Sequence, residues 1–149
     1  MILKPYEPSD LDGIMEDLRP IMKERLKALS GKFDNVVEFS HWAVTLDHGG
    51  PLGAAWFFKN PNGTAVAVAL STTRLVDLIY RDRLVAKTFI PLCKTAIECS
   101  REYLGYTRLI SHVHNSFPSS AKWMERMGFR AVGWREDLME YCYEPETTA

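Results

Sequence analysis

The N-terminal part of the chain combines a short extended stretch with a long helical pattern. Residues 2–6 are extended, and the turn that follows offers Ser9 or Asp10 as a helix N-cap. Pro20 is expected to divide the helix in two, because proline lacks the N–H that a helix interior uses. The helix is predicted from apolar residues that recur every three or four positions: Leu11, Ile14, Met15, Leu18, Ile21, Met22, Leu26 and Leu29.

Three strands follow, separated by two turn signals. Residues 30–38 show no clear period and are expected to be loose. The turns at residues 47–51 and 60–63 combine Asp or Asn with Gly and Pro. The strands span residues 39–46, 52–59 and 64–71. Small and β-branched residues dominate the third of them, which predicts a strand in the middle of a sheet, covered on both faces.

The second half of the chain alternates helix and strand. A helix is expected to end at Gly105, with an extra helical segment before it at residues 74–80. The later elements are a strand over residues 106–113, a helix over 115–127 and hairpin strands over 129–134 and 138–143. This order predicts a single α+β domain with α/β/α layers, in which a mainly antiparallel twisted sheet contains one central parallel pair. Residues 144–149 are expected to be a flexible tail.

The composition is that of a soluble globular protein and argues against two classes of partner. Apolar residues make up 46% of the 149 positions and charged residues 25%. The formal charge of -1 means that the chain has no excess of positive charge with which to bind a polyanion, so we expect no nucleic-acid partner. No apolar run approaches the roughly 20 residues that span a bilayer, and the N-terminus lacks a signal-peptide core. We therefore expect a cytoplasmic protein without membrane contact.

The three cysteines give no sign of a metal site or a disulfide framework. Cys93, Cys99 and Cys142 form neither a CxxC pair nor a Cys/His cluster. The sequence alone does not place a His or a carboxylate where it would activate one of these thiols as a nucleophile. We expect reduced, largely buried thiols and no metal.

A family resemblance rests on the segment from Asn115 to Phe129. An Asn lies just past a strand, and a helix with Trp123 and Met124 leads into Met127-Gly128-Phe129. Together with the element order of the whole chain, this segment resembles the GCN5-related N-acetyltransferase (GNAT) superfamily. The resemblance implies transfer of an acetyl group from acetyl-CoA to a small-molecule or protein amine, without a metal.

A narrower resemblance is to the GNAT-like proteins of T7-like tailed phages. It rests on a strand at residues 66–71, a long glycine-poor helix, Arg108-Leu109-Ile110, and the segment 123–129. It implies phage or host proteins as partners and a location in the host cytoplasm or the virion.

The GNAT resemblance implies a cofactor site around the second long helix. In the family, a loop of the form Arg/Gln-x-x-Gly-x-Gly/Ala closes its backbone N–H groups on the pyrophosphate. The nearest segment keeps Arg81 and Ala86 but has Leu84 at the glycine position, where a side chain would crowd the phosphate. The implied cofactor contacts are Leu70, Ser71, Arg81, Arg83, Ala86, Lys87 and Asn115. The alternatives are solvated charges for Arg81, Arg83 and Lys87, and an Asx turn or helix N-cap for Asn115.

Candidate catalytic residues lie at the end of the strand over residues 106–113. Histidine suits amine deprotonation, and alternation places His112 and His114 on one face. The plainer interpretation is a pair of hydrogen-bonded histidines at a strand end. The family's proton-donating Tyr is replaced by Met124, which leaves Tyr103, Tyr106 and Ser116 as candidate acids. Glu38, His41 and His48 lie near the expected substrate side, with a surface or loop position as the alternative.

Two functions remain open from the sequence. The first is an acetyl-CoA-dependent N-acetyltransferase. The second is a non-catalytic GNAT-fold protein, a phage accessory or virion component that acts by protein contact, and it is favoured by the missing glycine and the missing Tyr. Fold alone does not separate them. The sequence contains no motif of a hydrolase with a Cys or Ser nucleophile. A homodimer is compatible with either function.

Overall fold

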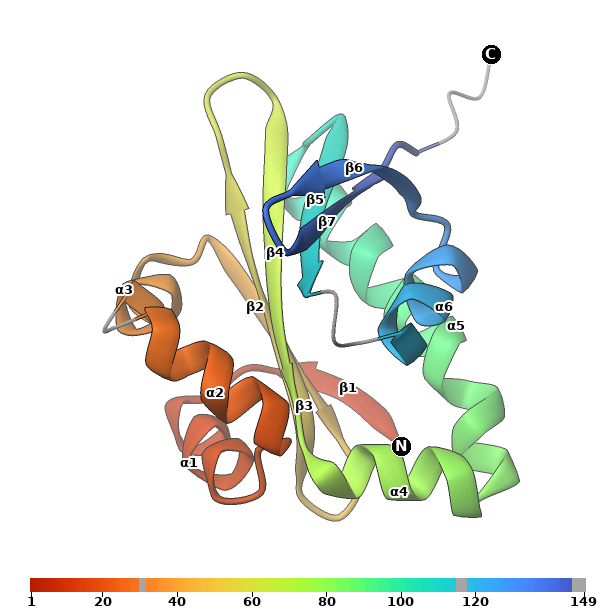
Figure 1. The fold of residues 1–149 in the computed structure, drawn as a ribbon. Helices are drawn as coiled ribbons and strands as arrows, with labels where there is room; N and C mark the ends of the chain where they lie inside the picture. Colours follow the sequence, from red (N-terminus) through yellow and green to blue (C-terminus); the bar gives the residue numbers. More distant parts are fainter. Residues whose placement is uncertain (30–31, 115–117, 146–149) are drawn as a thin grey trace.

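The computed structural model describes residues 1–29, 32–114 and 118–145, which form a seven-stranded mixed sheet with helices on both faces (Figure 1). The strand order is β1-β2-β3-β4-β5-β7-β6. The strands are β1 (Ile2–Pro5), β2 (Trp42–Asp47), β3 (Pro51–Lys59), β4 (Thr64–Ser71), β5 (Arg108–His114), β6 (Arg130–Arg135) and β7 (Leu138–Tyr143). The helices are α1 (Pro8–Glu16), α2 (Pro20–Leu29), α3 (Lys32–Phe39), α4 (Thr73–Arg81), α5 (Arg83–Leu104) and α6 (Pro118–Arg126).

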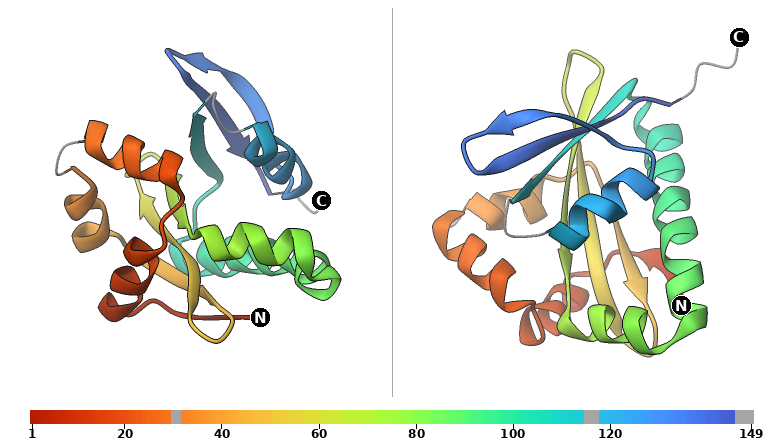
Figure 2. Two further views of the ribbon diagram at one scale, coloured as in Figure 1. Left: turned by 60° about the horizontal axis from the view of Figure 1, so that its bottom comes forward. Right: turned by 45° about the vertical axis from the view of Figure 1, so that its right-hand side comes forward.

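The helices divide between the two faces of the sheet (Figures 1 and 2). On one face, α1 to α3 cover β2 to β4 around Trp56 and Ile14, which are fully buried. On the other face, α5 packs against the sheet through Ala96 and Ile97, and α6 adds Met124 beside them. The layers and the mixed sheet confirm the predicted fold class.

Adjacent strands are antiparallel except for β4 and β5. These two are parallel, and they are paired only at Thr64↔Arg108, Ala65↔Leu109 and Val66↔Ile110. Beyond Val66, β5 pairs with β7 and no longer with β4. The sheet therefore opens at its centre, toward the C-terminal ends of β4 and β5.

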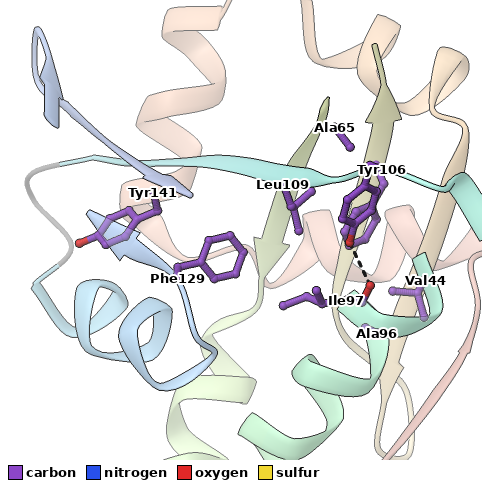
Figure 3. Close-up of a cluster of buried hydrophobic side chains, with 9 residues drawn as sticks. Val44, Ala65, Ala96, Ile97, Tyr106, Leu109, Phe129 and Tyr141 are labelled. Atoms are coloured by element: carbon purple, nitrogen blue, oxygen red, sulfur yellow. Dashed lines mark hydrogen bonds between the residues drawn. The ribbon is translucent and has the colours of Figure 1, made fainter. Parts of the chain in front are cut away.

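A buried cluster holds the closed end of this opening together (Figure 3). Ala65 of β4 and Leu109 of β5 are fully buried, and Phe129 lies in the same cluster. Just before β5, the Tyr106 hydroxyl donates to the Ile97 carbonyl of α5 at 2.9 Å and lies 2.8 Å from Ser100 Oγ. These contacts tie β5 to α5, because buried polar atoms are stable only when they are hydrogen-bonded.

Most elements follow the sequence prediction, and several details do not. The segment 74–80 is helical as expected, within α4, and β4 is the central strand. Residues 30–38, expected to be loose, contain most of α3, where Val36 and Val37 pack beside Trp56, so tertiary burial outweighs a weak local pattern. Consequently β2 begins at Trp42, after the predicted start of the strand. As expected, β4 packs on both faces, with Ala65 in the cluster below α5 and Leu70 in the cluster below α1 to α3, but Ala69 is exposed beside the opening.

The prediction of Ser9 or Asp10 as N-cap was wrong in position, because α1 starts earlier, at Pro8. Asp10 lies inside the first turn and is buried. Its carboxylate accepts from Thr45 Oγ1 at 2.9 Å, from Lys4 Nζ at 3.0 Å and from the Glu7 backbone N–H at 3.0 Å. One side chain therefore joins β1, α1 and β2.

Asp10→Asn is expected to lower the free energy of unfolding at pH 7 by about 1–3 kcal/mol, because an amide replaces a charged acceptor in a buried site. Burial alone would raise the pKa of Asp10, but hydrogen bonds from Glu7, Lys4 and Thr45 outweigh it and lower the pKa. A depressed folded-state pKa adds stability above the unfolded value, about 3.9, which is lost as the pH falls through the folded value.

Urea unfolding at pH 7 and at acidic pH measures both effects. The difference between wild type and Asp10→Asn should shrink as the pH falls. Asp12→Asn, at an exposed position of the same helix, is the control and should unfold like the wild type. A difference that stays constant with pH would show that the Asp10 charge is not responsible.

Candidate functional site

The opening between β4 and β5 contains a cavity of about 290 Å³. Its walls are mostly apolar, and β4 contributes Ala67 to Ser71 while β5 contributes Ser111, His112 and Val113. A central strand normally pairs along both edges, so strand segments that do not pair can offer backbone N–H and C=O groups to an extended ligand. The Ala67 carbonyl and both backbone groups of Ser71 already have partners within the protein. The shape suits a narrow chain that hydrogen-bonds along a strand edge.

The narrow end of the opening is bridged by one hydroxyl. Ser111 Oγ donates to the Ala67 carbonyl at 3.3 Å, one position past the last paired residues Val66 and Ile110. Sequence reasoning missed Ser111, because only the strand register shows that it stands where β4 and β5 separate.

Helices close the two sides of the cavity. On one side, Phe89 of α5 and Trp123 of α6 make an edge-to-face contact with ring centroids 5.0 Å apart. On the other side, Met22 of α2 lines the wall, and its sulfur accepts from the Ser71 backbone N–H at 3.3 Å. The predicted cofactor contacts Leu70 and Ser71 thus line the cavity, but the Ser71 N–H already has a partner.

A histidine and a carboxylate lie at the β5 side of the cavity. His112 Nε2 is 3.2 Å from Glu140 Oε1, and Glu140 is directly opposite on β7. The same Oε1 is 3.0 Å from Arg135 Nε of β6. Glu140 is the more buried of the three, with 15% of its side chain exposed.

The N-termini of both helices after β4 are occupied by the protein's own oxygen atoms. In α4, Asp17 accepts from the N–H groups of Thr73 and Arg74, and Thr72 Oγ1 accepts from that of Leu75 at 3.1 Å. In α5, Asp82 Oδ1 accepts from the N–H groups of Leu84 and Val85 at 3.0 and 3.3 Å. Free N–H groups at a helix N-terminus bind phosphate, and here they are held by the Asp17 and Asp82 carboxylates, the Asp17 carbonyl and the Thr72 hydroxyl.

Three cations surround a second, open hollow of about 540 Å³ on the surface. Arg83, Ala86 and Lys87 of α5 line it with Ile90, and Arg126 joins them from the end of α6. The predicted residue Arg81 is exposed at the end of α4 and does not line this hollow. Arg126 was missed, because nothing in the sequence relates the last turn of α6 to the first turns of α5.

The strand order, the single parallel pair that opens and the helices after β4 and β5 decide the fold. It is the GNAT acetyltransferase fold. Solved structures that share it include the GNAT domain of S. lividans PAT, which is 15% identical with a TM-score of 0.68 and covers 96% of this chain and 89% of that one. The sequence itself matches no protein-family model and no curated protein.

Two further GNAT-fold structures are similar over nearly the whole chain. An IAA acetyltransferase from Bacillus cereus is 15% identical with a TM-score of 0.67, and the alignment covers 97% of this chain and 99% of that one. A Bacillus subtilis acetyltransferase, solved in complex with CoA, is 14% identical with a TM-score of 0.66 and the same coverage.

Several predicted site residues of the GNAT pattern lie outside the described residues or away from the cavity. Asn115 and Ser116 lie outside the described residues, and His114 is described only by its backbone pairing with Leu138. Leu84, expected to crowd the phosphate, is 71% exposed and lines neither the cavity nor the surface hollow. In this structure, the carboxylate of Asp82 is what fills the start of α5.

The candidate acids among the tyrosines are not at the cavity. Tyr106 is buried with its hydroxyl bonded to α5, and burial raises its pKa to about 12. Tyr103 is 72% exposed and does not line the cavity. Met124 does line it, so the position that replaces the family's Tyr faces the site without a donatable proton.

The substrate-side candidates serve structural roles or lie apart. His41 Nδ1 accepts from the Lys59 backbone N–H at 2.8 Å, and the His48 carbonyl accepts from the Arg74 guanidinium. Glu38 is exposed on α3, and none of these three residues lines the cavity.

The cysteines are less uniform than expected. Cys142 is buried and Cys93 half-buried, but Cys99 is exposed on the outer side of α5. Cys93 lines the cavity, and burial raises the pKa of its thiol to about 12, so it is a neutral wall residue and not a nucleophile.

The described residues contain neither a cluster of metal ligands nor a helix that could span a membrane. Within residues 1–29, 32–114 and 118–145, no three His, Cys, Asp or Glu side chains come together as metal ligands would. No helix in the same ranges combines the length and apolar character needed to cross a membrane.

Proposed function

We propose that this protein is a GNAT-type N-acyltransferase that moves an acetyl group from acetyl-CoA to an amine. The observation that carries the proposal is the opening between β4 and β5, which is central, apolar and lined by strand segments that no longer pair with each other. A pantetheine arm is a narrow chain with two amides, and such a chain can hydrogen-bond to a strand edge as an added strand would. The CoA complex of the Bacillus subtilis neighbour supports the same ligand.

The two hollows suit the two ends of such a cofactor. The cations Arg83, Lys87 and Arg126 lie where the phosphates of CoA would meet side-chain charge instead of helix N–H groups. The arm would then enter the cavity from the open end, with its thioester toward Ser111 at the narrow end.

We assign His112 as the base that accepts a proton from the acceptor amine. An ammonium must lose a proton before its nitrogen can attack the thioester carbonyl carbon, and a neutral imidazole can accept that proton. Attack forms the N–C bond, and the C–S bond then breaks. The nitrogen gives up its second proton to solvent, and the thiolate takes a proton from solvent. The acceptor is a small-molecule or protein amine.

Binding of CoA tests the proposal directly. Calorimetry and thermal unfolding should show saturable binding, with about 2.7 kcal/mol of stabilisation at 100 times the dissociation constant. Adenosine 3′,5′-bisphosphate, which lacks the arm, should bind much more weakly. If millimolar CoA neither binds nor stabilises the protein, the acetyltransferase proposal fails.

Asp82→Asn should tighten CoA binding by about fivefold, because it removes one negative charge close to the phosphates. Asparagine keeps a side-chain oxygen for the N–H groups of Leu84 and Val85, so the helix cap is retained. Asp77→Asn, at an exposed position on α4, is the matched control and should bind like the wild type. Equal affinities of all three proteins would place the phosphates away from α5.

The second candidate function is a non-catalytic GNAT-fold protein that acts by protein contact. One observation favours it, namely that Asp17 and Asp82 occupy the N–H groups at which phosphate would bind. Under this proposal the protein would be a phage accessory component with phage or host partners, as the narrower resemblance implies. A folded protein that does not bind CoA would support this non-catalytic function.

A further inference from the structure

We propose that Glu140 is a positioning residue that fixes the ring of His112 for proton transfer from the acceptor amine; this rests on the proposed function. Glu140 lies on β7, directly opposite His112 in the antiparallel register, where side chains on one face are close neighbours. Its carboxylate Oε1 lies 3.2 Å from His112 Nε2.

Arg135 holds the carboxylate from the other side. Its Nε is 3.0 Å from the same oxygen, and it comes from β6, next to the turn that joins β6 to β7. Glu140 is therefore fixed by a cation that is itself 72% exposed, while the carboxylate is largely enclosed. Such a carboxylate cannot rotate freely away from the imidazole.

This arrangement selects one tautomer of the histidine. An ionised carboxylate only accepts hydrogen bonds, so neutral His112 must carry its proton on Nε2. Nδ1 then keeps its lone pair, and no described residue is bonded to it. His112 lines the cavity, so Nδ1 is the atom assigned to receive the amine proton, and the charge that results lies beside Glu140.

The chain offers a matched comparison four residues further on. Glu144 is also bonded to arginines, at 2.9 Å from Arg108 Nη2 and 3.1 Å from Arg130 Nη2. It contacts no histidine among the described residues and does not line the cavity. Glu144→Gln removes the same charge without touching His112.

The first test needs no activity. Long-range ¹H–¹⁵N correlation spectra of labelled protein in alkaline buffer report which imidazole nitrogen carries the proton, and His112→Gln identifies the signal. We expect the Nε2–H tautomer in the wild type and in Glu144→Gln, and a mixture of tautomers in Glu140→Gln. A mixture already present in the wild type would overturn the proposal.

The second test measures acetyl transfer. Glu140→Gln should lower kcat by about tenfold or more, with the KM for acetyl-CoA unchanged, and Glu144→Gln should change neither. In the His112→Gln background, Glu140→Gln should cause no further loss, because the two residues act as one unit. An equal loss in both backgrounds would mean that Glu140 does not act through His112.

The two tests separate the two proposals. A wild-type protein with the fixed tautomer but no acetyl transfer would contradict the proposed function and leave the Glu140–His112 pairing intact. A wild-type protein that transfers acetyl groups but shows a mixture of His112 tautomers would support the proposed function and contradict the role of Glu140.

Discussion

Ala69→Trp is expected to lose at least about a hundredfold in CoA affinity, or about 2.7 kcal/mol of binding free energy, while keeping its fold. Ala69 lines the cavity and is exposed, although β4 is the central strand of the sheet. An indole there would occupy the space between β4 and β5 that the pantetheine arm needs. Calorimetry with CoA measures the affinity.

The fold should tolerate this change because the new side chain enters open space and tryptophan suits a strand. Circular dichroism and the midpoint of urea unfolding should match the wild type closely. Ala131→Trp, at an exposed position on β6 outside the cavity, is the control and should bind CoA normally. Full CoA affinity in Ala69→Trp would show that the ligand does not lie in the opening.

Phe129→Ala is expected to lower the free energy of unfolding by about 3–5 kcal/mol, which is the cost of deleting a buried aromatic ring. Phe129 is 7% exposed and lies with Leu109 and Tyr141 in the cluster at the closed end of the opening (Figure 3). Its ring also contacts Tyr143, with centroids 5.5 Å apart. The melting temperature should fall by roughly 10 °C.

Differential scanning calorimetry and urea unfolding measure this effect. Val132→Ala, three residues further along and 51% exposed, should cost less than about 0.5 kcal/mol. If the two variants were equally stable, the anchoring of β6 and β7 would not depend on Phe129. Loss of stability without loss of CoA affinity in the surviving folded protein would separate this core from the ligand site.

The Gly128-Phe129 pair shows why the C-terminal half was predictable. Gly128 has φ of 99°, which favours glycine, and an added Cβ would meet Tyr143 at 3.3 Å. The Phe129 N–H then reaches the Met124 carbonyl at 3.0 Å and closes α6. These are local rules between neighbours in sequence, so helix end, turn and core residue could be predicted without a structure.

The segment between β4 and α5, where the phosphates of the cofactor were expected, was only partly predictable. The sequence indicated that Leu84 replaces a glycine and that a helical segment stands between β4 and α5, and α4 is that segment. It did not indicate that Asp17 occupies the N-terminus of α4, because this contact joins α1 to α4 across the fold. Asp82 caps α5 through contacts two and three residues along the chain, which a local pattern could have indicated but which were missed. The sequence therefore indicated Leu84 as the side chain that would block phosphate, but Leu84 is mostly exposed to solvent.

By itself, the sequence determined the period of the helices, the turns between β2, β3 and β4, the central place of β4 and the GNAT-type element order. The tertiary structure alone decided which residues meet at the opening. Ser111 faces Ala67, Glu140 faces His112, and Arg126 joins Arg83 and Lys87. Each pairing depends on strand register or helix packing between residues that are 28 to 44 positions apart in the sequence, and no local pattern encodes contacts at such separations.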